Sequence, residues 1–281
     1  MEEVGTRRIF SILDGASFSA VTNHQVRSAP GVTVNSFPDL VRLVAKLSFY
    51  NREHVLLFRG QSQDYLNIKG NTSVKPSLFR PERGKRSAPK PDELRLRYHL
   101  LRRADTLVSQ HFPFEGNQRI TRSRILRWAI LQHYEVCATP LLDVTHSLRV
   151  AASFATNDPS AKEPTLYVLG VPALSGSVTA SSEQGLQIMR LASICPPEAS
   201  RPYFQEGYLL AEYPDLISMD DKEKYKASEI DFGRRLLAKF RLNPSGFWSA
   251  DYQPIPNTAL YPDSQDPLVE YTAEIKRQLL P

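Results

Sequence analysis

An arginine at the end of a hydrophobic run is the residue whose type and position most clearly suggest chemistry. Residues 55–58, Val-Leu-Leu-Phe, are typical of a buried strand, and Arg59, Gly60 and Gln61 follow them directly. A strand would hold the planar guanidinium rigidly, ready for bidentate contact with phosphate or carboxylate. Gly60 would let a backbone or a ligand come close. Arg59 is therefore a candidate anion-binding residue, with a structural salt bridge at the strand end as the alternative.

Two further polar segments stand in apolar surroundings. Gln132, His133 and Tyr134 end an apolar helical stretch, and Asp143 follows two leucines within residues 139–145. A lone histidine in such a place is more often a hydrogen-bonded packing residue than a base or a ligand. The aspartate is favoured to bond backbone amides or an arginine rather than to act as a chemical base. Both are candidates for a site, and a structural role is the stronger reading of each.

Several common chemistries lack their sequence patterns here. There is no GxGxxG and no GxxxxGK[ST], so Rossmann and P-loop nucleotide binding are not predicted. His133, His146 and Asp143 do not match a ligand pattern such as HExxH, so no metal is expected. Ser147 lacks the glycines of a nucleophile elbow, which argues against acyl chemistry. The two cysteines are far apart without CxxC spacing and indicate neither a disulfide framework nor a structural zinc site.

The composition is that of an ordinary globular chain with a mild positive charge. Of the 281 residues, 41% are hydrophobic and the net charge is +5. Because there is no apolar run of roughly 20 residues and no signal-like start, we expect a cytoplasmic protein without a membrane partner. Basic residues concentrate in 80–103 and 119–127. This 80–127 region is either a nucleic-acid-binding face or a solvated surface.

Hydrophobic patterns predict the elements that must position these residues. Residues 36–50 have the spacing of an amphipathic helix with Ser36 as N-cap, and 165–171 form the clearest core strand. Further helices are expected at 92–110, 121–134, 146–155 and 268–280, with strands ending at Arg59 and at 139–145, 188–191, 203–212 and 239–242. Residues 81–91 are predicted to be a loop. The order lacks regular βαβ alternation, which favours an α+β fold.

Taken together, these segments resemble the FRG domain family, which is named after the triplet matched by residues 58–60. The family pattern continues with elements like PSLFR, QHYG, PTRLLDWT, AxxFA and QxGxF. Similar segments follow in the same order at 76–80, 132–135, 139–145, 151–155 and 205–208, and 260–263 resembles the closing segment. The resemblance implies an N-terminal extension over residues 1–34 and a single FRG domain over 35–281.

The chain departs from this pattern at several positions. Glu135 stands where glycine is usual, Val144 replaces tryptophan and Tyr208 replaces phenylalanine. Pro140 and Leu141 replace the usual Thr-Arg pair. A family role that depends on an arginine just before the Leu-Leu-Asp element therefore does not carry over.

The FRG pattern is in turn similar to the layout of ADP-ribosyltransferases. This second resemblance implies an ADP-ribosyltransferase-like split β-sheet flanked by helices, with NAD as cosubstrate. Arg59 would bind the pyrophosphate or ribose, Thr145 and Ser147 would brace the nicotinamide pocket, and Tyr134 or Tyr203 would stack on the base. The residues implied in binding are Arg59, Gly60, Gln61, Arg80, Gln132, His133, Tyr134, Thr145, Ser147 and Tyr203.

The catalytic acid is the open point of this resemblance. Alternate residues of a strand share a face, so only one of the neighbours Gln205 and Glu206 can face a cleft. With Gln205 inward, the domain would bind a nucleotide without turnover, or would use another acid such as Asp143. With Glu206 inward, transfer or NAD hydrolysis remains feasible.

The resemblance thus implies an NAD-binding ADP-ribosyltransferase or NAD glycohydrolase. Its role would be that of a toxin or phage-defence effector that modifies a protein or nucleic acid. The alternative is a non-catalytic nucleotide- or nucleic-acid-binding module that uses Arg59 and the basic 80–127 region. A nuclease with His133 or His146 as base is a third hypothesis.

Overall fold

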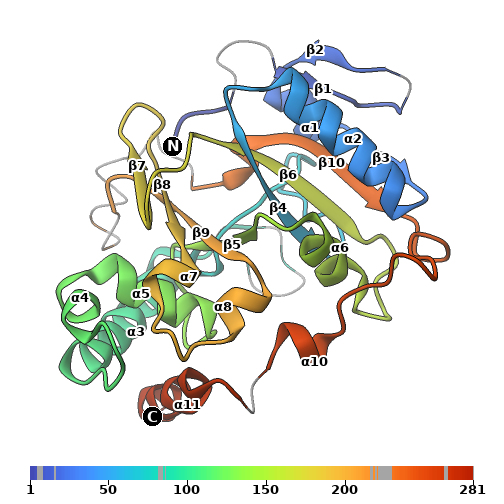
Figure 1. Ribbon diagram of the computed structural model, residues 1–281. Coiled ribbons are helices and arrows are strands. Elements are labelled where there is room, and N and C mark those ends of the chain that lie inside the picture. Colours follow the sequence, from blue (N-terminus) through green and yellow to red (C-terminus); the bar gives the residue numbers. More distant parts are fainter. Residues whose placement is uncertain are drawn as a thin grey trace.

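The fold is built on a large mixed sheet. The computed structural model describes residues 1–4, 9–15, 17–81, 85, 87–215, 218, 220, 230–262 and 265–280. Within them, an eight-stranded sheet has the order β3-β10-β6-β4-β5-β9-β8-β7, beside a two-stranded sheet of β1 and β2 (Figure 1). The larger sheet consists of β3 (Val32–Val34), β10 (Leu236–Leu242), β6 (Thr165–Val171), β4 (Val55–Gln61), β5 (Leu142–Thr145), β9 (Gly207–Glu212), β8 (Leu186–Arg190) and β7 (Val178–Ser181). The smaller sheet pairs β1 (Ile9–Ser11) with β2 (Ser19–Val21).

Neighbouring strands of the large sheet are antiparallel except for one pair. β3 runs parallel to β10, whereas β10, β6, β4, β5, β9, β8 and β7 follow one another in antiparallel order. Together with the helices around it, this mixed sheet confirms the α+β class predicted from the element order.

The sheet opens between two of its inner strands. β4 pairs with β6 along its whole length, from Val55 opposite Val171 to Gln61 opposite Thr165. Between β4 and β5, by contrast, the described residues form one register pair, Phe58 opposite Thr145. Arg59 therefore begins the stretch of β4 that has separated from β5.

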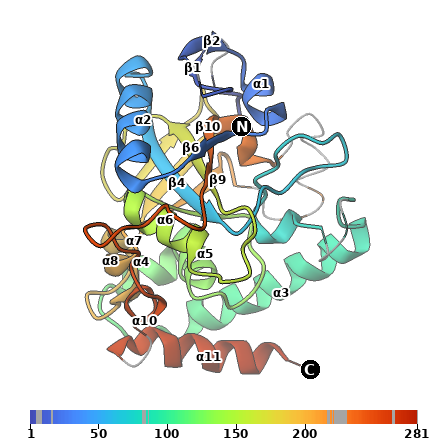
Figure 2. The same cartoon turned by 90° about the vertical axis from the view of Figure 1, so that its right-hand side faces the viewer.

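Helices surround the sheet. They are α1 (Asn23–Ser28), α2 (Phe37–Tyr50), α3 (Pro91–Gln110), α4 (Asn117–Arg122), α5 (Arg124–His133), α6 (Leu148–Thr156), α7 (Leu191–Ile194), α8 (Arg201–Phe204), α10 (Asn257–Leu260) and α11 (Pro267–Leu279), with short 3₁₀ turns η1 (Ser77–Phe79) and η2 (Phe232–Arg235). In both views α2 lies with β1 and β2 at the top, while α11 lies at the bottom (Figures 1 and 2). None of the helices in the described part of the chain has the length and apolar character to cross a membrane.

Helix α6 packs directly on β4 and fixes the strand that carries Arg59. A Cβ atom on Gly60 would lie 1.8 Å from the carbonyl oxygen of Ala151 and 2.7 Å from the amide nitrogen of Ala155. The glycine is required because the helix backbone of α6 touches the strand there. Gly60 thus serves a close approach of backbone to backbone, one of the two uses predicted for it.

The clearest sequence patterns match the elements closely. α2 begins after Ser36, whose hydroxyl accepts a hydrogen bond from the amide of Asp39, and it buries Leu40, Val44 and Leu47. β6 spans Thr165–Val171, as predicted, and every one of its residues is buried. Burial on both faces is what a run rich in β-branched and aromatic residues indicates.

The strand predicted over residues 203–212 begins later than expected. Arg201–Phe204 form the short helix α8, a turn follows, and β9 starts at Gly207. Pro202 explains the difference, because proline fits the first turn of a helix but cannot donate to a strand ladder. The premise that Gln205 and Glu206 are adjacent strand residues is therefore wrong.

Residues 1–34 contribute to the main sheet through β3, which pairs with Phe240, Arg241 and Leu242 of β10. The boundary between an extension and a domain at residue 34 stays a prediction. Asp263, from the predicted closing segment, and Arg83 and Arg86, from the basic region, lie outside the described residues.

A polar network buried beside the sheet connects β6, β10 and the chain after β4. The ammonium group of Lys239, on β10, donates to Asp64 Oδ2 at 2.9 Å, Thr72 Oγ1 at 2.6 Å and the carbonyl of Arg27 at 3.3 Å. Asp64 also accepts from the hydroxyl of Tyr167, on β6, at 2.8 Å. We call Asp64, Thr72, Tyr167 and Lys239 the Lys239 cluster; its lysine is 3% exposed.

Candidate functional site

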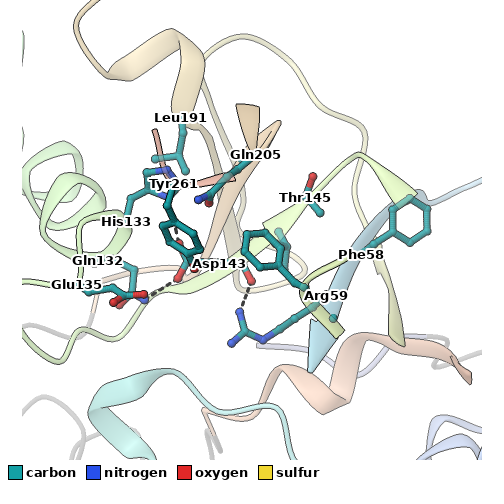
Figure 3. A pocket seen from close by; sticks show the side chains of 14 residues that line it. Phe58, Arg59, Gln132, His133, Glu135, Asp143, Thr145, Leu191, Gln205 and Tyr261 are labelled. Carbon is teal, nitrogen blue, oxygen red and sulfur yellow. Dashed lines mark hydrogen bonds and ion pairs between the residues drawn. The ribbon is translucent and has the colours of Figure 1, made fainter. Parts of the chain in front are cut away.

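A cavity of about 200 Å³ lies where β4 and β5 separate. It is lined by Phe58, Arg59, Gly60, Gln132, His133, Glu135, Asp143, Val144, Thr145, Phe154, Leu191, Gln205, Gly207 and Tyr261. Figure 3 shows Arg59 on one side, Gln132 and Glu135 on the other, and Asp143 between them. We refer to this site as the Arg59 cavity.

Arg59 spans the opening of the sheet. Its Nη1 donates to the backbone carbonyl of Asp143 at 2.5 Å, so the guanidinium occupies a position where a strand ladder would otherwise continue. With its amide oxygen turned toward the guanidinium, Gln61 accepts from Nε at 2.7 Å. Burial, followed by the positive charge of Arg80, lowers the pKa of Arg59 to about 10, so the side chain is a cation at neutral pH.

Asp143 is held as a carboxylate by two residues at the end of α5. Oδ2 accepts from Nε2 of Gln132 at 2.6 Å, and Oδ1 lies 3.4 Å from Nδ1 of His133. Burial is the largest influence on the pKa of Asp143 and raises it, but His133, Arg59 and Gln132 together outweigh burial and keep the pKa below its ordinary value. The side chain is 37% exposed, so the charge is open to the cavity.

The amide of Gln132 is fixed in one orientation by hydroxyl groups. Its oxygen accepts from Oγ1 of Thr139 and from Oγ of Ser77 at 3.3 Å. Its nitrogen must therefore face Asp143, which agrees with the short bond between them. This chain of bonds holds the carboxylate through residues that lie outside the cavity.

The polar side-chain atoms of Thr145 and Gln205 also form hydrogen bonds with other groups of the protein. Oγ1 of Thr145 donates to the carbonyl of Glu206 at 3.1 Å and accepts from the amide of Ser147 at 3.0 Å. Nε2 of Gln205 donates to the carbonyl of Leu260 at 2.8 Å. These two residues shape the cavity wall and tie it to β9 and α10.

On the side of the cavity lined by Tyr261, the guanidinium of Arg201 packs against the rings of Tyr134 and Tyr261. The guanidinium carbon of Arg201 lies 4.9 Å from the ring centroid of Tyr134 and 5.0 Å from that of Tyr261. The hydroxyl of Tyr134 donates to Asp266 at 2.7 Å, and burial raises the pKa of both tyrosines. These cation–π contacts join Arg201 of α8 to Tyr261, which lines the cavity, and to Tyr134, which lies behind it.

Of the predicted site residues, the structure brings seven together around the cavity. They are Arg59, Gly60, Gln132, His133, Asp143, Thr145 and Gln205. Gln61 lies next to them through its contact with Arg59. The roles assigned to these residues remain predictions.

The other predicted residues do not line the cavity. Glu206 sits in an exposed turn with φ of 44°, and Tyr203 is 52% exposed with its hydroxyl on the carbonyl of Ala192. Ser147 caps α6, while Tyr134 is buried behind the wall. Arg80 is exposed and bonds the carbonyl of Lys75, although its charge acts on Arg59.

Seven lining residues were not among the predicted site residues. They are Phe58, Glu135, Val144, Phe154, Leu191, Gly207 and Tyr261. All except Leu191 belong to segments that resemble the family pattern, so that resemblance was a signal for them. Leu191 stands at the start of α7 in a segment without a motif, and its position follows from tertiary packing alone.

Four arginines of the basic 80–127 region make contacts within the protein. Arg97 donates to the carbonyls of Ser77, Leu78 and Arg80, and Arg127 bonds Asp105 and the carbonyls of Ile120 and Thr121. Arg119 donates to the carbonyl of Ile194, and Arg103 to that of Gln278. Guanidiniums held in this way are less available for phosphates. A nucleic-acid-binding face in this region stays a prediction.

Comparison with known proteins identifies one region. Residues 54–164 match the family model of the FRG domain, whereas no curated protein and no solved structure matched the chain. The match includes Arg59, Gln132, His133 and Asp143, and it ends before the wall that Gln205 and Tyr261 complete. Residues 54–164, which carry the charged half of the Arg59 cavity, are therefore similar to the FRG domain.

Proposed function

We propose that the Arg59 cavity binds NAD or a related nucleotide and that the domain cleaves the bond between nicotinamide and ribose. The observation that carries this proposal is a cation and a carboxylate, Arg59 and Asp143, that face one cavity from two strands that have separated. NAD has negative phosphates at one place and a positively charged nicotinamide at another. A site for it therefore needs both kinds of charge.

The size of the cavity agrees with one part of this substrate. Pockets that enclose a whole ligand of this class have volumes of about 300–1,000 Å³. The Arg59 cavity, at about 200 Å³, is smaller, so in this proposal it takes the nicotinamide ring and its ribose alone. In this arrangement Arg59, assisted by the exposed Arg80, would contact the phosphates at the edge of the cavity.

The chemistry follows from the charge of the leaving group. Nicotinamide leaves with the electron pair of the carbon–nitrogen bond, and the ribose carbon becomes positively charged. A carboxylate in a partly dry site stabilises this charge as it develops. Asp143 faces the cavity and Glu206 does not, so we assign the stabilising role to Asp143. Water or a hydroxyl of a target then forms the new carbon–oxygen bond and releases a proton.

The test is an assay of nicotinamide release together with a measurement of NAD binding. Arg59→Ala is expected to weaken binding, and Asp143→Asn to reduce turnover, while Glu206→Gln serves as the matched acid control. Wild-type protein that neither binds nor consumes NAD would overturn the proposal. NAD binding without nicotinamide release would contradict the proposed cleavage and leave only the proposed binding.

The proposed biological role is that of a toxin or phage-defence effector acting on a protein or nucleic acid in the cytoplasm. The family resemblance is its support. Expression of wild-type protein and of the Asp143→Asn variant in bacteria tests this role, since growth inhibition by the wild type alone is expected. Equal growth of both strains would contradict it.

A further inference from the structure

His133 has one ring nitrogen that the protein orients and another that it leaves without a partner. The side chain is 3% exposed and contributes to the wall of the Arg59 cavity. Nδ1 lies 3.4 Å from Oδ1 of Asp143, whereas Nε2 is buried and has no hydrogen-bond partner among the described residues. An unsatisfied polar atom in such a place requires an explanation, and a ligand is one.

The pairing with Asp143 determines which nitrogen carries the proton in the neutral ring. Asp143 is a carboxylate at neutral pH and can only accept, so the proton lies on Nδ1 and the lone pair lies on Nε2. The distance of 3.4 Å is long for a hydrogen bond, as is common in acid–base pairs before a substrate is bound. Gln132 holds the other carboxylate oxygen and prevents the side chain from turning away.

Space beside the imidazole comes from a glycine. A Cβ atom on Gly207 would lie 3.5 Å from Cε1 of His133 and 2.7 Å from Cδ1 of Leu191. Cε1 is bonded to Nε2, and the space that Gly207 leaves beside the imidazole is filled by Leu191. Leu191 is the side chain that covers this region, and it also lines the cavity.

We propose that His133 is the general base of the reaction described above. In the step, Nε2 takes the proton of the attacking water or hydroxyl as its oxygen bonds to the ribose carbon and nicotinamide leaves with its electron pair. Asp143 then stabilises the imidazolium, which returns its proton to solvent. The inference rests on the proposed function and adds a second duty for Asp143, that of positioning the base.

Other charged groups near the ring belong to the same wall. Arg201 of α8 donates to the carbonyl of His133 at 3.2 Å, and the ring of Tyr134 lies 5.6 Å from the imidazole. Glu135 lines the same cavity. Asp143 is the acid in contact with the imidazole, and its replacement should therefore alter the pH dependence most.

The test compares His133→Gln with His146→Gln, since His146 is an exposed histidine outside the cavity. For His133→Gln, we expect NAD affinity within threefold of wild type and turnover reduced by about 100-fold or more. The pH profile of turnover in the variant should differ from that of the wild type, because the variant lacks the base. His146→Gln should keep both the rate and the profile.

Nitrogen NMR of the histidine ring gives a second measurement that does not depend on turnover. The His133 signal, assigned by its loss in His133→Gln, should report a ring proton on Nδ1, and Asp143→Asn should shift it. A proton on Nε2 in the wild type would overturn the inference. So would undiminished turnover by a folded His133→Gln, with the proposed function left intact. A wild-type protein without NAD turnover would overturn the proposed function and the base assignment with it.

Discussion

The sheet carries two neighbouring networks of buried charge, and they differ in how completely the protein satisfies them. Tyr167 lies opposite Arg59 on one side and opposite Lys239 on the other, so the three residues form a row across β4, β6 and β10. In the Lys239 cluster, the ammonium group has three bonds and Asp64 accepts from three side chains. In the Arg59 cavity, Nε2 of His133 has no partner among the described residues and Asp143 is partly exposed.

This contrast separates a structural use of charge from a functional one. A fully bonded buried pair fixes the elements around it, and its loss leaves an uncompensated charge. A network with an open carboxylate and an unpaired nitrogen instead has bonds available for a ligand. Substitutions in the two networks should therefore change different measured quantities.

The largest expected effect is on stability, in the Lys239 cluster. Lys239→Met leaves the carboxylate of Asp64 without its cation, and we expect the free energy of unfolding to fall by about 3–5 kcal/mol. Urea denaturation measures this loss. The double variant with Asp64→Leu should recover part of it, because no charge is then left unpaired. A loss below about 1 kcal/mol in the single variant would contradict the structural role given to the Lys239 cluster.

Next in size is the effect of Arg59 on binding. Hydrogen bonds to charged groups are worth about 1.5–3 kcal/mol, so Arg59→Ala should weaken NAD binding roughly 10- to 150-fold. Calorimetry measures this change, and the free energy of unfolding should move by less than in Lys239→Met. Arg59→Lys tests the planar fork, since it keeps the charge but loses bidentate geometry. Unchanged NAD affinity in Arg59→Ala would show that this arginine has a structural role and does not bind the ligand.

A smaller effect concerns how the free energy of unfolding changes with pH in the acid range, which we call the acid limb. The pKa of Asp143 is lower in the folded chain than its ordinary value of about 3.9, so the folded state favours the carboxylate. Its contribution to stability is complete above about pH 4 and is lost as the pH falls through the folded pKa. Asp143→Asn should flatten this limb in acid titrations followed by circular dichroism. The exposed acid variant Glu206→Gln should keep it, and an unchanged slope in Asp143→Asn would contradict the prediction.

The smallest expected effect is at Glu135, a wall residue whose backbone has φ of 54°. Glycine adopts this conformation without strain, so Glu135→Gly should stabilise the protein by about 0.5–1 kcal/mol. The melting temperature should rise by roughly 1–4 °C. Glu135→Ala is the matched control because it removes the carboxylate but keeps the strain. Equal melting temperatures for the two variants would show that charge, and not backbone geometry, matters here.

Sequence patterns predicted the elements that depend on local periodicity. The helix that begins after Ser36 and the core strand 165–171 were predicted almost to the residue, because burial follows the spacing of apolar side chains. β1, β2 and β3 were missed, since strands of three residues show no period. Tyr203 and Phe204 were predicted to begin a strand, but they end the short helix Arg201–Phe204, which has a proline in its first turn.

The sequence predicted those site residues that belong to motif-like segments and also lie close together in the fold. Arg59, Gln132 and Asp143 were all named from sequence and line one cavity. Glu206 was named for its type, but its place in an exposed turn depends on where α8 ends. The contributions of Leu191 and Tyr261 depend on how distant segments pack, which single-sequence patterns do not encode.

The wall that holds Tyr261 joins segments that are far apart along the chain. Gln205 bonds the carbonyl of Leu260, and Asn157 bonds that of Ile255 at 2.9 Å. A ligand that touches both Arg59 and Tyr261 would connect two segments that are far apart in the sequence. By thermodynamic linkage, a ligand at 100 times its dissociation constant adds about 2.7 kcal/mol to the stability of the folded state. Binding of a ligand to the Arg59 cavity should therefore make residues 253–262 more resistant to proteolysis. This holds even for a ligand that the protein does not convert.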